Sequence, residues 1–350
     1  MKVLESIEIN NCDWKYLFKH GKDIRLDNFI NSMRDDNRPF INDKYQLSHY
    51  LGGISFGSKT YVDDVIKFSR IGMFELIDNP EALYEEFSIK KKNGKRRTLY
   101  KVNDPLKGVQ RSIVRNILSH YEISEYATAY KKGASIKKNA EIHSGKKYLL
   151  KMDLKDFFGH ITYDMVLSLV FNSRSYSPFA KYALTKLCCY KGKLAQGAPT
   201  SPAISNIVMK HFDDVMGSWA KNNGISYSRY SDDITFSSNH KLYPAYVKAK
   251  SLLNKMGFEA NEEKTHFVTN ANRMIVNGIT VNNMPRAPID YRRKLRQDIY
   301  YLLKYKDSYY SELDYRTLLN SVMGRINWVL QIDPKDMYFL RARDLIYEVL

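Results

Sequence analysis

The stretch RYSDDITFSS, residues 229–238, places two adjacent carboxylates, Asp232 and Asp233, inside a run of β-branched and aromatic residues that favours a strand. Neighbouring aspartates repel each other and favour turns, so the pair costs stability unless a surface position or a cation relieves it. Tyr230 and Phe236 alternate with polar neighbours, which predicts a hairpin whose bend carries both carboxylates. A solvated turn and a metal site explain this stretch equally well, and the rest of the chain has to distinguish them.

The composition is typical of a folded protein that binds nucleic acid. The 350 residues include 55 Lys and Arg against 38 Asp and Glu, a formal net charge of +17, and 13% are aromatic. This length and aromatic content suffice for one large core or two to three subdomains. The positive field attracts polyanions, although a generally basic surface would give the same charge count.

The cysteines and the apolar runs exclude several classes of protein. Cys12, Cys188 and Cys189 are too few and too badly spaced for a disulfide framework or a paired zinc site. Charges interrupt the N-terminal residues too early for a signal peptide, and no run of about 18 apolar residues occurs. We therefore expect a cytoplasmic protein with no membrane partner.

Residues 87–102, FSIKKKNGKRRTLYKV, predict a β-hairpin with a basic tip. Asn93-Gly94 tolerates the positive φ angles of a tight type I′ turn. Six of the eight residues 90–97 are basic. Such a run is usually a solvated face, but a rigid cationic hairpin is also suited to holding phosphates, which is the interpretation we favour.

A second carboxylate site is predicted in KKYLLKMDLKDFF, residues 146–158, where Asp153 ends a buried strand. A carboxylate at such a position is normally expelled from the core. The alternative is that it faces a cleft in which a metal ion offsets the desolvation cost.

The following segments predict an α+β fold. The turn-rich QGAPTSP, residues 196–202, precedes a core-packed helix over 203–224, and another amphipathic helix covers about 246–256. MIVNGITV then predicts a second hairpin centred on Asn277-Gly278. We expect a small, mainly antiparallel sheet backed by helices, followed from residue 285 by a purely helical segment with a basic face.

Asp153 and the Asp232-Asp233 pair would meet around divalent cations if the two elements that carry them lie side by side. Two magnesium ions about 4 Å apart are the usual device for in-line phosphoryl displacement, and magnesium selects hard oxygen ligands. Together with a basic hairpin for a triphosphate and a basic helical segment for a duplex, these carboxylates predict nucleotidyl transfer.

The motifs LKMDLKDFF, QGAPTSP, YSDD and VNG, in this order over residues 86–284, resemble those of reverse transcriptases. The resemblance implies a right-hand polymerase fold with an antiparallel palm sheet and a helical C-terminal thumb. It implies that Asp153, Asp232 and Asp233 bind two Mg²⁺ ions, for which Mn²⁺ can substitute. The expected parts are the N-terminal helical fingers, residues 1–85, the fingers and palm, 86–284, and an RNA-binding thumb, 285–350.

Further roles follow from the same resemblance. Phe158 falls at the steric gate that rejects a ribose 2′-hydroxyl, with the neighbouring Phe157 as the alternative. The nucleotide-binding positions are matched by Arg97, Gln196 and Gly197. Lys264 matches a lysine that protonates the leaving pyrophosphate, so it joins the three aspartates as a catalytic residue.

NAEIH, Asn139 to His143, is similar to the N-A-x-x-H signature of retron reverse transcriptases, whose V-T-G signature stands here as Val276-Asn277-Gly278. The asparagine departs from that pattern. The alternative for His143 is an ordinary polar cap at a helix end. A nucleic-acid-binding role is expected for five residues: Asn139, His143, Arg292, Arg293 and Arg296.

The retron resemblance implies an enzyme that copies part of a cognate non-coding RNA, the msr-msd RNA, into branched RNA-linked single-stranded DNA, msDNA. Its partners would be that RNA, its DNA product, dNTP substrates and an effector protein encoded nearby, in antiphage defence. The alternatives are another bacterial reverse transcriptase, of the defence-associated or diversity-generating kind, and a catalytically inactive RNA-binding scaffold. A scaffold has no need to keep three carboxylates, a gate aromatic and a nucleotide loop together.

Overall fold

The computed structural model describes residues 41, 47, 50–51, 76–90, 94, 96–305 and 312–348. Most of the helical pieces predicted within residues 1–85, and Asn93 at the tip of the basic hairpin, lie outside these residues. None of the helices in the described part is long and apolar enough to cross a membrane.

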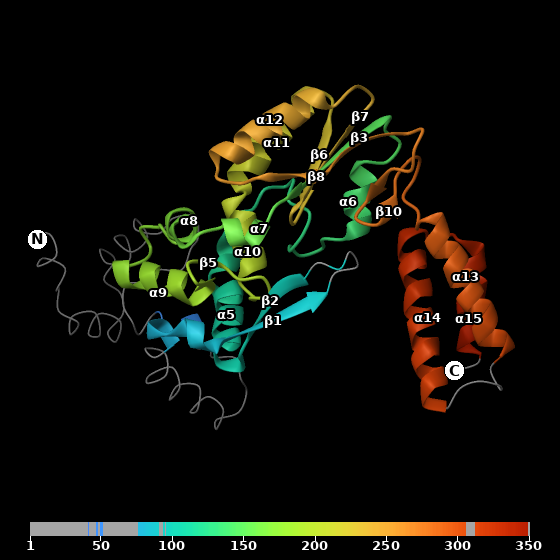
Figure 1. Cartoon of the computed structure of the whole chain (residues 1–350), viewed down its shortest axis with the longest axis horizontal. Coiled ribbons are helices and arrows are strands. Elements are labelled where there is room, and N and C mark those ends of the chain that lie inside the picture. Colours follow the sequence, from blue (N-terminus) through green and yellow to red (C-terminus); the bar gives the residue numbers. More distant parts are fainter. Residues whose placement is uncertain are drawn as a thin grey trace, which may run out of the picture. The chain divides into compact units, whose positions relative to one another are not determined.

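The described chain alternates short helices and strands up to residue 280 and is helical from residue 289 onward (Figure 1). The strands are β1 (Tyr84–Lys90), β2 (Arg96–Val102), β3 (Tyr148–Leu154), β4 (Cys189–Tyr190), β5 (Lys193–Leu194), β6 (Ser226–Tyr230), β7 (Asp233–Ser238), β8 (Ala260–Thr269), β9 (Ile275–Val276) and β10 (Ile279–Thr280). The α-helices are α5 (Asp104–Asn116), α6 (Ile136–Ile142), α7 (Phe157–His160), α8 (Tyr163–Met165), α9 (Pro178–Cys188), α10 (Ser201–Val208), α11 (Lys210–Asn222), α12 (Tyr243–Lys255), α13 (Ile289–Lys304), α14 (Glu312–Ile332) and α15 (Met337–Tyr347). The short 3₁₀ and π segments are η1 (Pro80–Leu83), η2 (Leu118–His120) and η3 (Val166–Val170).

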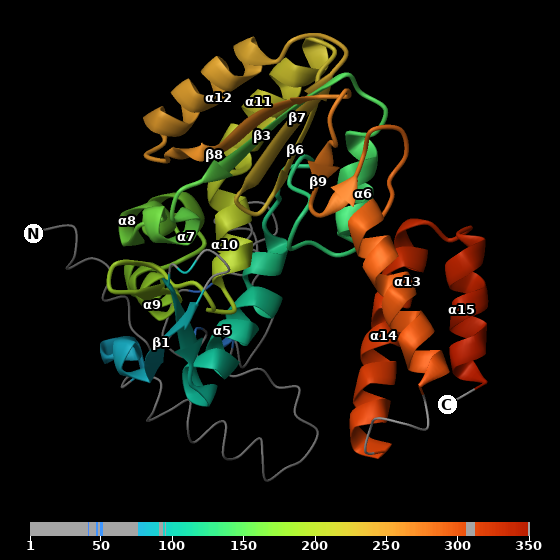
Figure 2. The same cartoon turned by 45° about the vertical axis from the view of Figure 1, so that its right-hand side comes forward.

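The main sheet has the order β6-β7-β3-β8, and all three pairings are antiparallel. Figures 1 and 2 show α11 and α12 along one face of this sheet and α6 on the other. Successive residues of β6 point to opposite faces of the sheet. The Tyr227 side chain contacts Asp213 of α11, and the next side chain, Ser228, contacts His143 at the end of α6. The predicted α+β class, with an antiparallel sheet backed by helices, is confirmed.

The three predicted hairpins are present. β1 pairs with β2 along its whole length, from Tyr84 opposite Val102 to Lys90 opposite Arg96. β6 and β7 flank a two-residue turn, and β9 and β10 flank Asn277-Gly278, whose φ angles of 46° and 80° fit the expected type I′ geometry. The helix predicted over 203–224 is instead two helices, because Met209 has a ψ of −2° in place of the roughly −42° of a regular helix.

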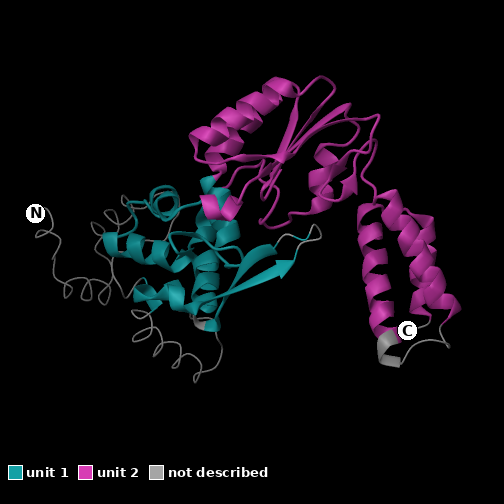
Figure 3. Cartoon of the chain, viewed as in Figure 1, with its two compact units in different colours: residues 1–122, 161–208 teal, residues 123–160, 209–350 magenta. Residues whose placement is uncertain are grey.

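The chain forms two compact units, each built from two separate stretches (Figure 3). Unit 1 comprises residues 1–122 and 161–208, and unit 2 comprises residues 123–160 and 209–350. These units cut across the segment boundaries expected at 85 and 284, and the functional segments remain a prediction.

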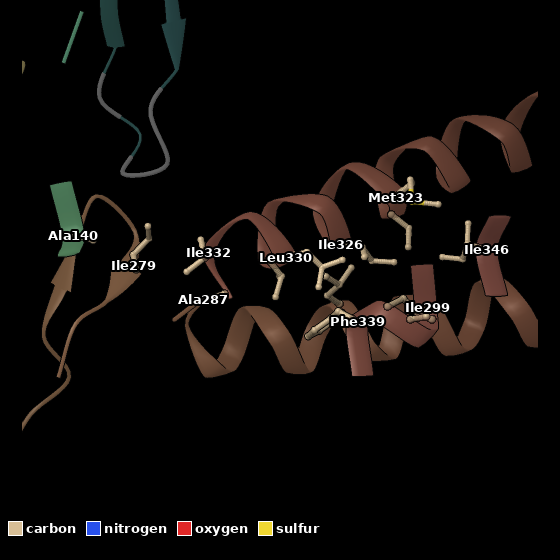
Figure 4. Close-up of a cluster of buried hydrophobic side chains, with 14 of the residues drawn as sticks. Ala140, Ile279, Ala287, Ile299, Met323, Ile326, Leu330, Ile332, Phe339 and Ile346 are labelled. Carbon is tan, nitrogen blue, oxygen red and sulfur yellow. The ribbon is translucent and has the colours of Figure 1, made fainter. Parts of the chain in front are cut away.

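Within unit 2, the three C-terminal helices share an apolar core with the β9–β10 hairpin and α6 (Figure 4). Ile326 and Leu330 of α14, Ile299 of α13 and Phe339 of α15 point into the space between the helices. Each of these side chains is at most 8% exposed, so burial of apolar surface holds the segment together. The predicted purely helical segment after residue 285 is confirmed.

Candidate active site

The sheet register brings the predicted carboxylates to one end of the sheet in unit 2. Asp153 of β3 is the direct cross-strand partner of Asp233 of β7. Asp232 lies in the β6–β7 turn, and its main-chain carbonyl accepts a hydrogen bond from the Leu154 N–H at 3.1 Å. The predicted hairpin is therefore confirmed, although only Asp232 lies in its bend and Asp233 is the first residue of β7. The position of Asp153 near the end of its strand is confirmed.

The turn that carries Asp232 is strained at Ser231. Ser231 has a φ of +62°, and Asp232 is not among the positive-φ residues, as in a type II′ turn, which normally has glycine at the first position. The Ser231 hydroxyl is within 2.8 Å of the Tyr130 hydroxyl, and the Ser231 carbonyl accepts from Nη1 of Arg229 at 2.9 Å. Strain of this kind persists where the surroundings hold the residue in place, and it is common at active sites.

Behind the turn lies a fully buried ion pair that sequence reasoning missed. Arg229 and Asp213 both have side chains with no exposed surface, and their closest contact joins Nη2 to Oδ2 at 2.7 Å. Nε of Arg229 donates to both carboxylate oxygens, and the Tyr227 hydroxyl donates to Oδ1 at 2.7 Å. Burial alone would lower the pKa of Arg229, but the adjacent carboxylate outweighs this effect and raises it, so the guanidinium stays charged.

One signal in the sequence points to this pair. Asp213 falls on the apolar face of its helix, beside the buried Phe212 and Met216. An acidic residue on such a face requires a buried partner. The sequence does not show which basic residue supplies it.

Lys264 reaches the carboxylates from an irregularity in β8. The register between β3 and β8 shifts between Lys151 and Asp153, so that residues 262–265 have no partner in the ladder. Such bulges re-aim side chains next to active sites. Here Nζ of Lys264 lies 2.8 Å from Oδ2 of Asp153, which brings the predicted lysine to the predicted carboxylate.

The carboxylates repel one another, and a cation relieves that repulsion. Desolvation raises the pKa of Asp233; the charge of Lys151 opposes the rise, and Asp232 and Asp153 add to it. The described residues contain no ready-made group of three or more His, Cys, Asp or Glu side chains that could hold a metal ion. A cross-strand pair of carboxylates nevertheless fits magnesium, which commonly binds one or two carboxylates plus substrate phosphates.

The two candidate gate residues differ in burial. Phe157 is 4% exposed and contacts Phe258, with ring centroids 6.1 Å apart. Phe158 is only partly buried, and its ring centroid lies 5.3 Å from that of Phe157. Phe157 is therefore a core residue, which leaves Phe158 as the aromatic ring accessible to a ligand.

Three of the predicted nucleotide-binding residues, Arg97, Gln196 and Gly197, belong to unit 1, whereas Phe158 belongs to unit 2. Nε of Arg97 donates to Oε1 of Gln196 at 2.8 Å, and the Tyr100 N–H of the same strand donates to the Gln196 carbonyl at 3.0 Å. Gly197 has a φ of +117°, and a Cβ there would lie 2.3 Å from the Tyr100 carbonyl oxygen. Only glycine allows the loop to approach β2 so closely.

The structure corrects the role expected for Asn139 and His143. Their side chains are 1% and 0% exposed, so neither can contact a nucleic acid in this conformation. The two ring nitrogens of His143 lie 2.8 Å from the hydroxyls of Ser237 and Ser228, which ties α6 to β7 and β6. Burial, with a smaller contribution from Lys146, lowers the pKa of His143 to about 3.

The three thumb arginines lie in different surroundings on α13. Arg292 is partly buried and forms an ion pair with Asp336. Arg293 is exposed. Arg296 is also exposed, and its guanidinium lies 4.5 Å from the ring centroid of Tyr338. Arg293 and Arg296 present charge to solvent, whereas Arg292 mainly links α13 to the start of α15.

Comparison with known proteins shows the family to which the chain belongs. Residues 89–302 match the family model described as reverse transcriptase (RNA-dependent DNA polymerase), so the chain is an RNA-directed DNA polymerase in class. It is 32% identical over 273 residues to the Retron Ec83 reverse transcriptase of Escherichia coli, covering 74% of this chain and 86% of that protein. It is also 30% identical over 281 residues to the Retron Ec86 reverse transcriptase of Escherichia coli, covering 78% of this chain and 84% of the other. The chain belongs to the retron reverse transcriptases.

More distant similarities are found among solved structures. The foamy viral protease–reverse transcriptase with double-stranded DNA matches with a TM-score of 0.37 and 14% identity, covering 83% of this chain and 42% of that one. The apo telomerase of Candida tropicalis matches with a TM-score of 0.38 and 13% identity, covering 67% of this chain and 49% of that one. At these TM-scores they add nothing to the family assignment.

Reverse transcriptase domains, the family that residues 89–302 match, use divalent metal ions.

Proposed function

We propose that this chain is the polymerase of a retron, which copies part of a cognate structured non-coding RNA into single-stranded DNA that stays joined to the RNA through a 2′–5′ branch. The observation that carries the proposal is the direct cross-strand pairing of Asp153 with Asp233, in a chain that belongs to the retron reverse transcriptases. The biological context would be antiphage defence with an effector protein encoded nearby.

In the proposed site, Asp153, Asp232 and Asp233 would hold two Mg²⁺ ions, for which Mn²⁺ would substitute. The metal, when bound, supplies charge neutralisation for the attacking and leaving oxygens. Two features support this assignment: the like charges at the end of the sheet favour a cation there, and carboxylate oxygens are the ligands that magnesium selects.

The other residues position the substrate and move a proton. In each step the primer hydroxyl loses its proton to solvent, its oxygen bonds to the α-phosphorus of the dNTP, and the bond from that phosphorus to the leaving pyrophosphate breaks. Lys264 donates a proton to that pyrophosphate, a role supported by its 2.8 Å contact with Asp153. Arg97 and Gln196, held together by their 2.8 Å hydrogen bond, contact the incoming nucleotide with Gly197, and Phe158 excludes the ribose 2′-hydroxyl.

RNA binding is assigned to the exposed basic residues of α13. Arg293 and Arg296 would contact phosphates of the folded RNA, and the formal net charge of +17 supports a polyanionic partner. Arg292 would contribute less, because its guanidinium already pairs with Asp336.

The polymerase site is tested by primer extension on an RNA template. We expect synthesis to require Mg²⁺ or Mn²⁺, and Asp232→Asn to abolish it. Glu259→Gln serves as the control, because it changes an exposed carboxylate whose partner is Lys155. Undiminished synthesis by Asp232→Asn would refute the assignment of the carboxylates.

The branched product is tested by expressing the protein with its native flanking locus and isolating the nucleic acid that copurifies. We expect a short DNA that shifts on a gel after debranching. Finding only linear complementary DNA would favour another kind of bacterial reverse transcriptase. Neutralising Arg293 and Arg296 should weaken binding of the cognate RNA and flatten its salt dependence, while extension of a generic primed template falls much less.

A further inference from the structure

The two retron-like motifs, NAEIH at 139–143 and VNG at 276–278, meet beside the carboxylates. The side-chain amide of Asn139, on α6, donates to Oδ1 of Asn277, in the β9–β10 turn. Nδ2 of Asn277 in turn lies 3.4 Å from Oδ2 of Asp233. Hydrogen bonds therefore link residues 138 positions apart in the sequence to a carboxylate of the proposed metal site.

The direction of this chain of hydrogen bonds is fixed from its Asp233 end. An ionised carboxylate only accepts hydrogen bonds, so the amide nitrogen of Asn277 must face Asp233 and its oxygen must face Asn139. Asn139 then donates through its own amide nitrogen, and its oxygen accepts from the Thr128 hydroxyl at 2.9 Å. Because Asn139 is 1% exposed and engaged at both ends, it has little freedom to turn away.

The backbone at residue 277 suits asparagine. Asn277 has a φ of +46°, which asparagine tolerates better than other non-glycine residues and which a β-branched residue such as threonine adopts only at high cost. Asparagine at this position, in place of the threonine of the V-T-G signature, thus combines the turn conformation with an amide that reaches Asp233.

We infer that Asn277, oriented by Asn139, is a positioning residue that holds the Asp233 carboxylate in one orientation for cation binding. This inference rests on the proposed role of Asp233 as a metal ligand. A carboxylate rotates between equivalent orientations unless a donor fixes it, and outer hydrogen bonds to metal ligands typically change metal affinity or activity by about 10–100-fold. The two motifs, NAEIH and VNG, would then hold in place the β6–β7 hairpin that carries Asp232 and Asp233.

The test uses a substitution that keeps the turn. Asn277→Gly preserves the positive φ and removes the side-chain amide that reaches Asp233. The matched control is Asn223→Gly, because Asn223 is the C-cap residue of α11 and its side-chain amide donates to the main-chain carbonyl of Trp219 at 2.8 Å rather than to a carboxylate.

Mn²⁺ affinity of the purified protein, measured from the electron paramagnetic resonance signal of the free ion, is the first readout. We expect Asn277→Gly to weaken it by about tenfold and Asn223→Gly to leave it unchanged. In primer extension, Asn277→Gly should lower kcat with little change in the KM for dNTP, and excess Mn²⁺ should restore part of the rate.

Two outcomes overturn the inference. One is wild-type Mn²⁺ affinity in Asn277→Gly; the other is a loss of rate that merely follows a lowered unfolding temperature. The underlying assignment is checked separately with Asp233→Asn. If that variant keeps both Mn²⁺ affinity and activity, the proposed function of Asp233 fails; if it loses both while Asn277→Gly keeps them, only the positioning role fails.

Discussion

Replacing Asp213 by asparagine would leave the guanidinium of Arg229 charged and buried beside a neutral side chain. Neither residue has any exposed surface, so water cannot take over the role of the lost carboxylate. Removing one partner of a buried pair costs about 3–5 kcal/mol, because the remaining charge is uncompensated. For a folded unit of the size of unit 2, which contains both residues, that loss corresponds to a fall in Tm of roughly 6–20 °C.

Replacing all three side chains of the buried network by apolar ones separates its contribution to stability from its contribution to the geometry of the β6–β7 turn. Asp213→Leu, Arg229→Met and Tyr227→Phe together remove both charges and the hydroxyl that donates to Asp213, so most of the stability should return. The Ser231 carbonyl still loses its hydrogen bond from Arg229, and this turn carries Asp232. We therefore expect near-wild-type thermal unfolding with polymerase activity that remains low.

The assay is thermal unfolding followed by circular dichroism, with primer extension on the same preparations. Glu259→Gln is the control, because its ion pair with Lys155 is more than half exposed on both sides and should contribute less than about 1 kcal/mol. If Asp213→Asn costs no more than this control, the buried pair does not hold the turn and the reasoning is wrong.

Three further substitutions test other parts of the molecule. Phe158→Ala should admit ribonucleotides in a competition assay while deoxynucleotide incorporation stays measurable; unchanged discrimination would mean that another residue is the gate. Because the folded-state pKa of His143, about 3, lies below its unfolded value, its contribution to stability is complete above about pH 6.5 and is lost as the pH falls. His143→Gln should therefore remove about 2 kcal/mol of the difference in unfolding free energy between pH 7 and pH 5, and an identical difference in both proteins would contradict this. Gly197→Ala would place a Cβ 2.3 Å from the Tyr100 carbonyl oxygen and should raise the KM for dNTP by at least about tenfold, which steady-state kinetics would show or disprove.

Several features of the fold follow from short-range patterns in the sequence. The alternation around Asp232-Asp233 and the Asn-Gly dipeptides predicted hairpins that the structure contains, because turn chemistry and strand periodicity act over a few residues. The apolar stripe over 203–224 also predicted the buried face of a helix. It did not reveal the break at Met209, because one altered ψ angle leaves the apolar spacing on either side intact.

The sequence also suggested the catalytic chemistry. Asp153 at a strand end and two aspartates in a turn are costly unless a cation lies between them, and the register does make Asp153 and Asp233 partners. The motif order supplied Lys264, whose contact with Asp153 depends on an irregular pairing that no local pattern encodes. A bulge is a property of two strands together.

Only the tertiary structure decided what the buried polar side chains do. The motif NAEIH predicted side chains that contact nucleic acid. Asn139 and His143 are instead buried inside unit 2, where they form hydrogen bonds with side chains of other elements. Likewise, Arg229 and Asp213 pair across a strand and a helix. Turns and amphipathic faces depend on residues that are close in the sequence. Hydrogen bonds and ion pairs between buried side chains depend instead on the distance and orientation of the two partners, which are determined by packing between segments far apart in the chain.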